Sequence, residues 1–148
     1  MSKLTAMVKN LGIEDRVTFI TDIIDYDALT SYYKSATLFV FPTREDCLGV
    51  VILEALHCGL PVIATSVGGI PDMIKNGTNG ILVRPDESLE LANAISLLLD
   101  NECFRRKLAA NARRSLISRY YKRRITLGEA LMRSIGNSQN DWRINQSS

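Results

Sequence analysis

The sequence has few of the residues that build metal sites and disulfide frameworks. Of its 148 residues, three are cysteines and one is a histidine. No two cysteines stand in a C-x-x-C pair. A sparse, odd set of cysteines argues against a zinc site or a disulfide framework and favours a reducing compartment. We therefore expect a cytoplasmic protein without a metal site.

Long apolar runs are also missing. No stretch reaches the ~18 apolar residues typical of a membrane-spanning helix. The N-terminal segment MSKLTAMVKNLG lacks the apolar core of a secretory signal. Hydrophobic residues make up 46% of the chain and charged residues 23%, close to the average of globular domains. Length and composition thus predict one domain with a single core.

Acidic side chains are scarce in the last third of the chain. Residues 1–100 carry 7 basic and 13 acidic side chains, whereas residues 101–148 carry 11 basic and 3 acidic ones. Nine basic residues lie within 105–124 with no acid among them: Arg105, Arg106, Lys107, Arg113, Arg114, Arg119, Lys122, Arg123 and Arg124.

Two interpretations of this basic segment stay open. It is either the solvated face of a docked helix or a surface that attracts an anionic membrane, which would make the protein membrane-peripheral. We expect no nucleic-acid binding, because no pattern of stacking aromatic residues accompanies the charge.

Short apolar segments alternate with helical patterns along the chain. Strands are predicted at 16–21, 37–43, 60–65 and 80–85, and helices at 27–36, 50–58, 71–77, 86–100 and within 101–135. Continuous apolar runs are typical of strands covered on both faces. Strand–helix alternation with short connections predicts a parallel α/β sheet.

Several boundaries carry their own signals. Pro71 is suited to the first position of a helix and Gly77 to its end, and Asp86 or Ser88 is a candidate cap for the next helix. We expect residues 1–135 to form the folded part and residues 136–148 a disordered tail.

Residues 46–65, DCLGVVILEALHCGLPVIAT, begin with Asp46 and are otherwise largely apolar. Glu54 is the one carboxylate within this apolar part. Burying an unpaired charge is costly. Glu54 is therefore either exposed or held by a partner. Glu54 and His57 are three residues apart and could pair on an exposed helix face, in which case Asp46 would be a simple cap.

The loop that precedes Glu54 suggests a binding site. Ligands of parallel α/β sheets bind outside the carboxyl ends of the strands. Residues 43–49 leave such an end and enter a helix near Gly49, where unpaired N–H groups can hold a phosphate. Asp46 and Glu54 would flank this terminus and accept hydrogen bonds from hydroxyl groups. A phosphorylated, polyhydroxylated ligand would fit between them.

A second loop, TSVGGIPD at 65–72, also leaves a strand and enters a helix. Gly68 and Gly69 would let the backbone approach a ligand closely. A plain tight turn explains the same pair of glycines.

The segment FPTREDCLGVVILEALHCGLPVIATSVGGIPDMIKNGTNGILVRPDE, residues 41–87, closely resembles the donor-binding region of retaining glycosyltransferases of family 4, also called group 1. The resemblance extends from about Leu4 to Tyr121. It implies the Rossmann-like C-terminal half of a GT-B fold, with about four strands flanked by helices. It also implies transfer of a hexose from a UDP-, GDP- or ADP-sugar to an acceptor hydroxyl, with no cofactor.

The family motif is a pair of glutamates with seven residues between them. Glu54 matches the second, which in the family holds the ribose hydroxyls of the nucleotide. Asp46 matches the first, a contact to the donor hexose, and is one methylene shorter. Cys47 and Leu48 replace the glycine and phenylalanine usual between them.

The resemblance also implies roles for backbone groups. The amides of Gly49, Val50 and Val51 are expected to cradle the diphosphate and hexose. Residues 20–22 resemble the loop beside the base, with Thr21 in place of the usual glycine. Residues 67–71 are similar to the second glycine loop of the family.

Parts of the family architecture have no counterpart in the sequence. These are the acceptor-binding domain and two strands of the donor domain with the Arg/Lys pair that neutralises the diphosphate. We therefore expect a C-terminal fragment, a split half or a degenerate copy that is inactive alone, is marginally stable or oligomeric, and meets a glycan or lipid-linked acceptor through the missing domain. The alternative is a non-enzymatic α/β interaction or membrane-docking module.

Overall fold

The computed structural model describes residues 3–22, 26–46 and 49–115. The expected tail at 136–148 lies outside this part. The chain divides into two compact units, with the boundary between Tyr32 and Tyr33. Its elements are α1 (Lys3–Asn10), η1 (Glu14–Arg16), α2 (Tyr26–Ser35), β1 (Phe39–Phe41), α3 (Val50–His57), β2 (Val62–Thr65), α4 (Ile70–Met73), β3 (Gly80–Val83) and α5 (Ser88–Asp100). Residues 102–115 form a further helix.

The first unit differs from the sequence-based expectation. The sequence predicts a strand at 16–21. In the structure η1 ends at Arg16, and residues 17–21 form no strand. Phe19 and Ile20 are about half exposed, at 48% and 45%. A β-rich composition favours a strand only where a neighbouring strand pairs with it. The described sheet therefore has three strands, not about four.

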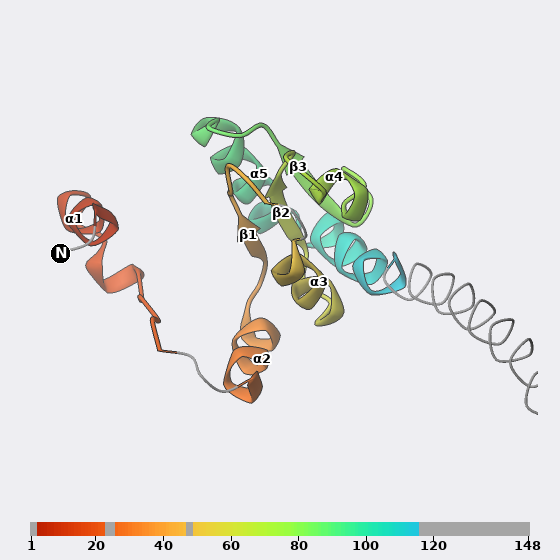
Figure 1. Cartoon of the computed structure of the whole chain (residues 1–148), viewed down its shortest axis with the longest axis horizontal. Helices are drawn as coiled ribbons and strands as arrows, with labels where there is room; N and C mark the ends of the chain where they lie inside the picture. Colours follow the sequence, from red (N-terminus) through yellow and green to blue (C-terminus); the bar gives the residue numbers. More distant parts are fainter. Residues whose placement is uncertain (1–2, 23–25, 47–48, 116–148) are drawn as a thin grey trace, which may run out of the picture. The chain divides into compact units, whose positions relative to one another are not determined.

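The second unit contains a parallel sheet, as predicted. Its strand order is β1-β2-β3, and both pairs are parallel (Figure 1). Val40 lies opposite Ile63, which lies opposite Ile81. All four residues of β2 are buried, as expected of a continuous apolar strand inside a parallel sheet.

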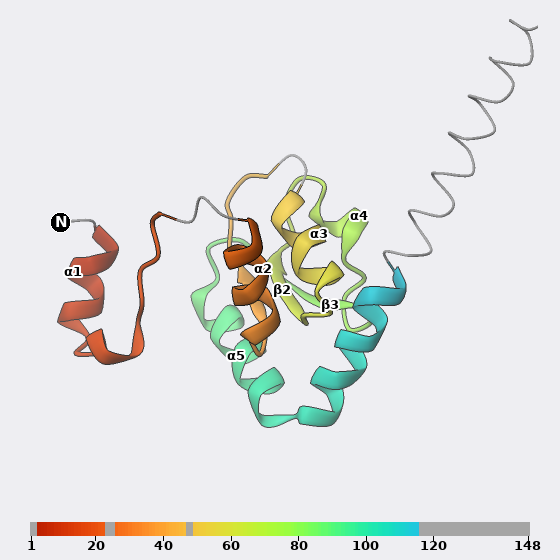
Figure 2. The same ribbon diagram turned by 90° about the horizontal axis from the view of Figure 1, so that it is seen from below.

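The two faces of the sheet carry different partners. Successive side chains of a strand point to opposite faces. Ile63 belongs to a core cluster with Ala94 and Leu98 of α5 and Leu108 of the following helix. On α3 the residues Ile52, Ala55 and Leu56 are buried, and α3 contacts β2 (Figure 2). The result is the helix-covered sheet predicted from the apolar runs.

Two helix boundaries differ from the prediction by more than one residue. α4 ends at Met73 rather than at Gly77, because the buried side chain of Asn79 competes for the backbone. Its Oδ1 accepts the N–H of Lys75 at 2.6 Å, and its Nδ2 donates to the carbonyl of Met73 at 3.0 Å. The N-cap of α5 is Glu87 and makes no side-chain capping bond, so neither Asp86 nor Ser88 is the cap.

Candidate functional site

The loop after β1 enters α3 through a left-handed glycine, near the position predicted from the sequence. Gly49 is the N-cap of α3, with φ 51° and ψ 38°. Its carbonyl accepts the N–H groups of Ile52 and Leu53 at 2.9 and 3.3 Å. Val50 and Val51 therefore occupy the first two helical positions, where N–H groups have no acceptor within the helix. Val50 is exposed, at 56%.

Asp46 caps this turn. Its Oδ1 accepts a hydrogen bond from the backbone N–H of Gly49. This bond places the Asp46 carboxylate beside the start of α3, although the N-cap of the helix itself is Gly49 and has no side-chain capping bond. Cys47 and Leu48, also predicted as site residues, lie outside the described residues.

The two glycine loops meet. A Cβ on Gly68, which has φ 51°, would lie 1.9 Å from the carbonyl oxygen of Asp46. A Cβ on Gly49 would lie 2.3 Å from Cε of Met73 in α4. The close backbone approach predicted at Gly68 is therefore made by the loop of Asp46. This contact within the protein accounts for the need for glycine there.

Glu54 has a partner inside the second unit. The hydroxyl of Tyr33 donates to Oε2 of Glu54 at 3.0 Å. Glu54 is partly buried, and Tyr33 is only 9% exposed. Glu54 makes no ion pair with His57 in the described part of the chain, and His57 is exposed. The expectation that a carboxylate in this apolar helix needs a partner is met by a phenol.

No local sequence pattern points to Tyr33. The two residues are 21 positions apart and lie on different helices, α2 and α3. The ring of Tyr33 packs edge-on against Phe39, with ring centroids 5.6 Å apart and an interplanar angle of 62°. The apolar surroundings of Glu54 called for a partner without identifying it.

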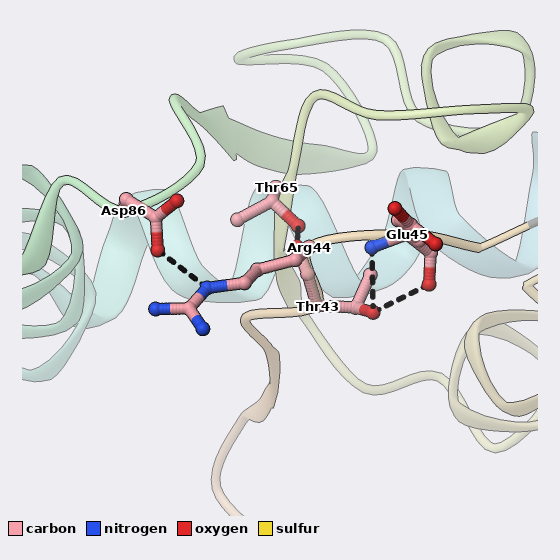
Figure 3. A network of polar contacts seen from close by, with 5 residues as sticks. All are labelled: Thr43, Arg44, Glu45, Thr65 and Asp86. Atoms are coloured by element: carbon pink, nitrogen blue, oxygen red, sulfur yellow. Dashed lines mark hydrogen bonds and ion pairs between the residues drawn. The ribbon is translucent and has the colours of Figure 1, made fainter.

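A polar network closes the carboxyl ends of the strands. Thr65 at the end of β2 donates to the carbonyl of Thr43, whose hydroxyl bonds to the backbone of Glu45 (Figure 3). Arg44 extends away from this turn and pairs with Asp86 after β3 at 2.6 Å. The network fixes the start of the loop that carries Asp46 and Gly49.

An open groove of about 500 Å³ lies at these strand ends. Its walls include Pro42, Thr65 and Val83, which end or follow the three strands. Arg84 at its rim donates to Glu90 at 2.9 Å, and this side-chain hydrogen bond is the main cause that lowers the pKa of Glu90 below its ordinary value. The described site residues Asp46, Gly49 and Glu54 do not line the groove.

The remaining predicted site segments are exposed or make turns. Residues 20–22 belong to the first unit and are exposed, and Thr21 donates to its neighbour Asp22. In residues 67–71, Val67 accepts the N–H of Ile70, and Gly69 is the N-cap of α4.

Metal-binding groups do not converge within the described residues. No set of three or more His, Cys, Asp or Glu side chains there is placed to hold a metal ion. Cys58 and Cys103 are free thiols. No helix in the described ranges is long and apolar enough to cross a bilayer.

The basic segment is described as far as residue 115. Leu108 and Ala112 are buried, while Lys107, Arg113 and Arg114 are exposed. Two other basic side chains have internal partners: Arg105 donates to carbonyls at the end of α5, and Arg106 pairs with Glu102. Residues 119–124 lie outside the described part.

Comparisons with known proteins agree with one another. The family model for glycosyl transferases of group 1 matches residues 2–115. The alpha-D-kanosaminyltransferase of Streptomyces kanamyceticus is 37% identical over 109 residues, which cover 74% of this chain and 28% of that enzyme. The chain thus spans less than a third of the length of this relative.

Two solved structures share the fold. The C-terminal domain of LpcC, a group 1 family protein of Francisella tularensis, matches with a TM-score of 0.74 and 30% identity, over 80% of this chain and 60% of that one. HepE of Anabaena in complex with UDP matches with a TM-score of 0.77 and 31% identity, over 87% and 35%. HepE has also been solved with UDP-glucose.

Proposed function

The chain belongs to the glycosyl transferases of group 1 and has the Rossmann-like fold of the C-terminal half of a GT-B enzyme, and we propose that it binds the nucleotide-sugar donor. In the complete enzyme it would act in the transfer of a hexose, with retention of configuration, from a nucleoside diphosphate sugar to an acceptor hydroxyl. The acceptor, a glycan or lipid-linked sugar, would be held by another domain.

The observation that carries this proposal is the held carboxylate of Glu54. Glu54 lies four residues into α3, and Tyr33 fixes one of its oxygens. Its position matches the family glutamate that holds the ribose. A carboxylate oxygen accepts hydrogen bonds from hydroxyl groups. Glu54 would therefore bind the ribose while the start of α3 takes the diphosphate.

The start of α3 would supply the electrostatic part of the reaction. Negative charge develops on the diphosphate as it leaves the sugar. The N–H groups of Val50 and Val51, at the positive end of the helix dipole, would stabilise that charge. Asp46, Cys47, Leu48 and Gly49 would line the path between diphosphate and hexose. In this account neither a metal nor a resident cofactor is required.

The identity of the nucleotide base in the donor can be determined by comparing nucleotides. HepE, at 31% identity, has been solved with UDP and with UDP-glucose, which supports a UDP-sugar as the first donor to test. Thermal shift of the full chain with UDP, GDP and ADP, side by side, would identify the preferred nucleotide. We expect one of them to raise the melting temperature more than the others.

Substitution of Glu54 tests the site itself. Glu54→Gln should weaken binding of the preferred nucleotide by ~1–3 kcal/mol, because a charged hydrogen-bond acceptor for the ribose is lost. His57→Gln, on the exposed side of the same helix, is the matched control. Unchanged affinity for Glu54→Gln in a calorimetric titration would remove Glu54 from the site.

A further inference from the structure

We propose that Tyr33 is a positioning residue of the donor site: its hydroxyl holds the Glu54 carboxylate in the orientation that accepts the ribose hydroxyls. This inference rests on the proposed function of Glu54. It adds a residue from outside the loop and helix that carry the family motif.

The phenol of Tyr33 is itself fixed. Tyr33 is 9% exposed, and its ring packs edge-on against Phe39. Phe39 is in turn anchored in β1, where its N–H donates to the carbonyl of Pro61 at 2.9 Å and its ring stacks on Phe41. The hydroxyl therefore reaches Glu54 from a rigid support.

The hydrogen bond leaves the carboxylate able to bind a ligand. An ionised carboxylate has about four acceptor sites on its two oxygens. Tyr33 occupies one site on Oε2, and no second hydrogen bond to the Glu54 carboxylate is found among the described residues. Oε1 and the remaining site of Oε2 can then accept two hydroxyl donors, as a ribose diol presents them.

Positioning of this kind lowers the cost of binding. A glutamate side chain has several rotamers, and fixing it on ligand binding costs conformational entropy. Where Tyr33 has already selected one rotamer, the nucleotide meets an ordered acceptor. Loss of the hydroxyl should therefore weaken binding even though the aromatic packing stays.

Tyr33→Phe separates this role from packing, because phenylalanine keeps the ring beside Phe39 and removes only the hydroxyl. In calorimetric titrations of the full chain with UDP, GDP and ADP, we expect roughly threefold to tenfold weaker binding of the preferred nucleotide. The melting temperature without nucleotide should fall only modestly, because Glu54 is partly exposed and water can replace the lost hydroxyl. Tyr32→Phe removes the same atom from the preceding residue of α2 and should bind as the unmodified chain does.

A double-substitution cycle assigns the effect to Glu54. If Tyr33 acts through this carboxylate, Tyr33→Phe should have no further effect in a Glu54→Ala background. As a second readout, Tyr33→Phe should reduce the preference for the ribonucleotide over its 2′-deoxy form. Both effects are absent if Tyr33 is only a structural residue.

The outcomes distinguish this inference from the proposed function. One outcome would overturn the role of Tyr33 and leave the donor site standing. In that outcome Glu54→Gln binds the nucleotide more weakly, whereas Tyr33→Phe keeps normal affinity and a normal preference for the ribonucleotide. An equal loss from Tyr33→Phe with and without Glu54 also overturns it. If none of the three nucleotides binds, or Glu54→Gln binds normally, the donor site fails and the inference fails with it.

Discussion

Gly68 is the residue at which the two loops of the site have the least space. Its φ of 51° lies in the left-handed region, and a Cβ would meet the carbonyl oxygen of Asp46 at 1.9 Å. Gly68 therefore lies against the loop that places Asp46 at the start of α3. A side chain at position 68 must therefore displace backbone in the site.

We expect Gly68→Ala to lower the free energy of unfolding by about 2–4 kcal/mol, from left-handed strain plus the forced shift of the Asp46 loop. Gly59→Ala is the matched control, because Gly59 has φ 77° and nothing within 4 Å of an added Cβ. It should cost only about 1–2 kcal/mol. Urea denaturation followed by circular dichroism measures both, and equal losses would contradict the contact.

At the same scale, the sequence identified Glu54 but not its partner. The apolar neighbours of Glu54 are consecutive in the chain, so the need for a partner is visible in the pattern. Tyr33 is brought to Glu54 by the packing of its ring on Phe39, which is a tertiary contact. No local period in α2 distinguishes Tyr33 from Tyr32.

At the scale of elements, Asn79 joins the end of α4 to the helix of residues 102–115. It is 2% exposed, and its amide bonds to Lys75 N–H, to the Met73 carbonyl and to the hydroxyl of Ser115 at 2.9 Å. One side chain thus ends α4 and anchors the last described helix.

Asn79→Ala should lower the free energy of unfolding by about 2–4 kcal/mol, because it removes three hydrogen bonds in a partly buried region, two of them to backbone groups. Asn76→Ala removes one exposed hydrogen bond to the N–H of Leu82 and should cost no more than about 1 kcal/mol. Chemical denaturation of the two variants in parallel measures both losses of stability. A loss at Asn79 no larger than at Asn76 would show that the junction is unimportant for stability.

Elements were predicted well where local pattern and tertiary structure agree. β2 and α3 follow from a continuous apolar run and from a glycine before a helix. α4 ends early because Asn79, six residues after Met73, competes for its last carbonyl. Residues 17–22 have strand composition and no strand in the structure, because pairing is decided by neighbours and not by composition.

At the scale of the whole molecule, the helix of residues 102–115, here called the basic helix, presents a charged surface that the donor site does not use. Leu108 and Ala112 on one side of this helix are buried, whereas Lys107, Arg113 and Arg114 are exposed. Such a surface attracts anionic lipid by roughly 1 kcal/mol per basic residue near the membrane. This supports a membrane-peripheral location as a proposal beside the donor site.

Co-sedimentation with vesicles tests that location. We expect the full chain to bind vesicles of phosphatidylcholine with phosphatidylglycerol at low salt, and not vesicles of phosphatidylcholine alone. Replacement of Lys107, Arg113 and Arg114 by glutamine should weaken the binding, while Lys75→Gln, an exposed lysine elsewhere, should not. Vesicle binding that is absent, or indifferent to these charges, returns the helix to a solvated face.

The most direct measurement for the whole account is a pair of titrations with the preferred nucleoside diphosphate and its 2′-deoxy form. The unmodified chain should bind the ribonucleotide more tightly, and Glu54→Gln should lose most of that difference while it keeps its fold. Equal affinity of the unmodified chain for the two forms, or a preference that survives Glu54→Gln, would contradict the assignment of Glu54 to the ribose.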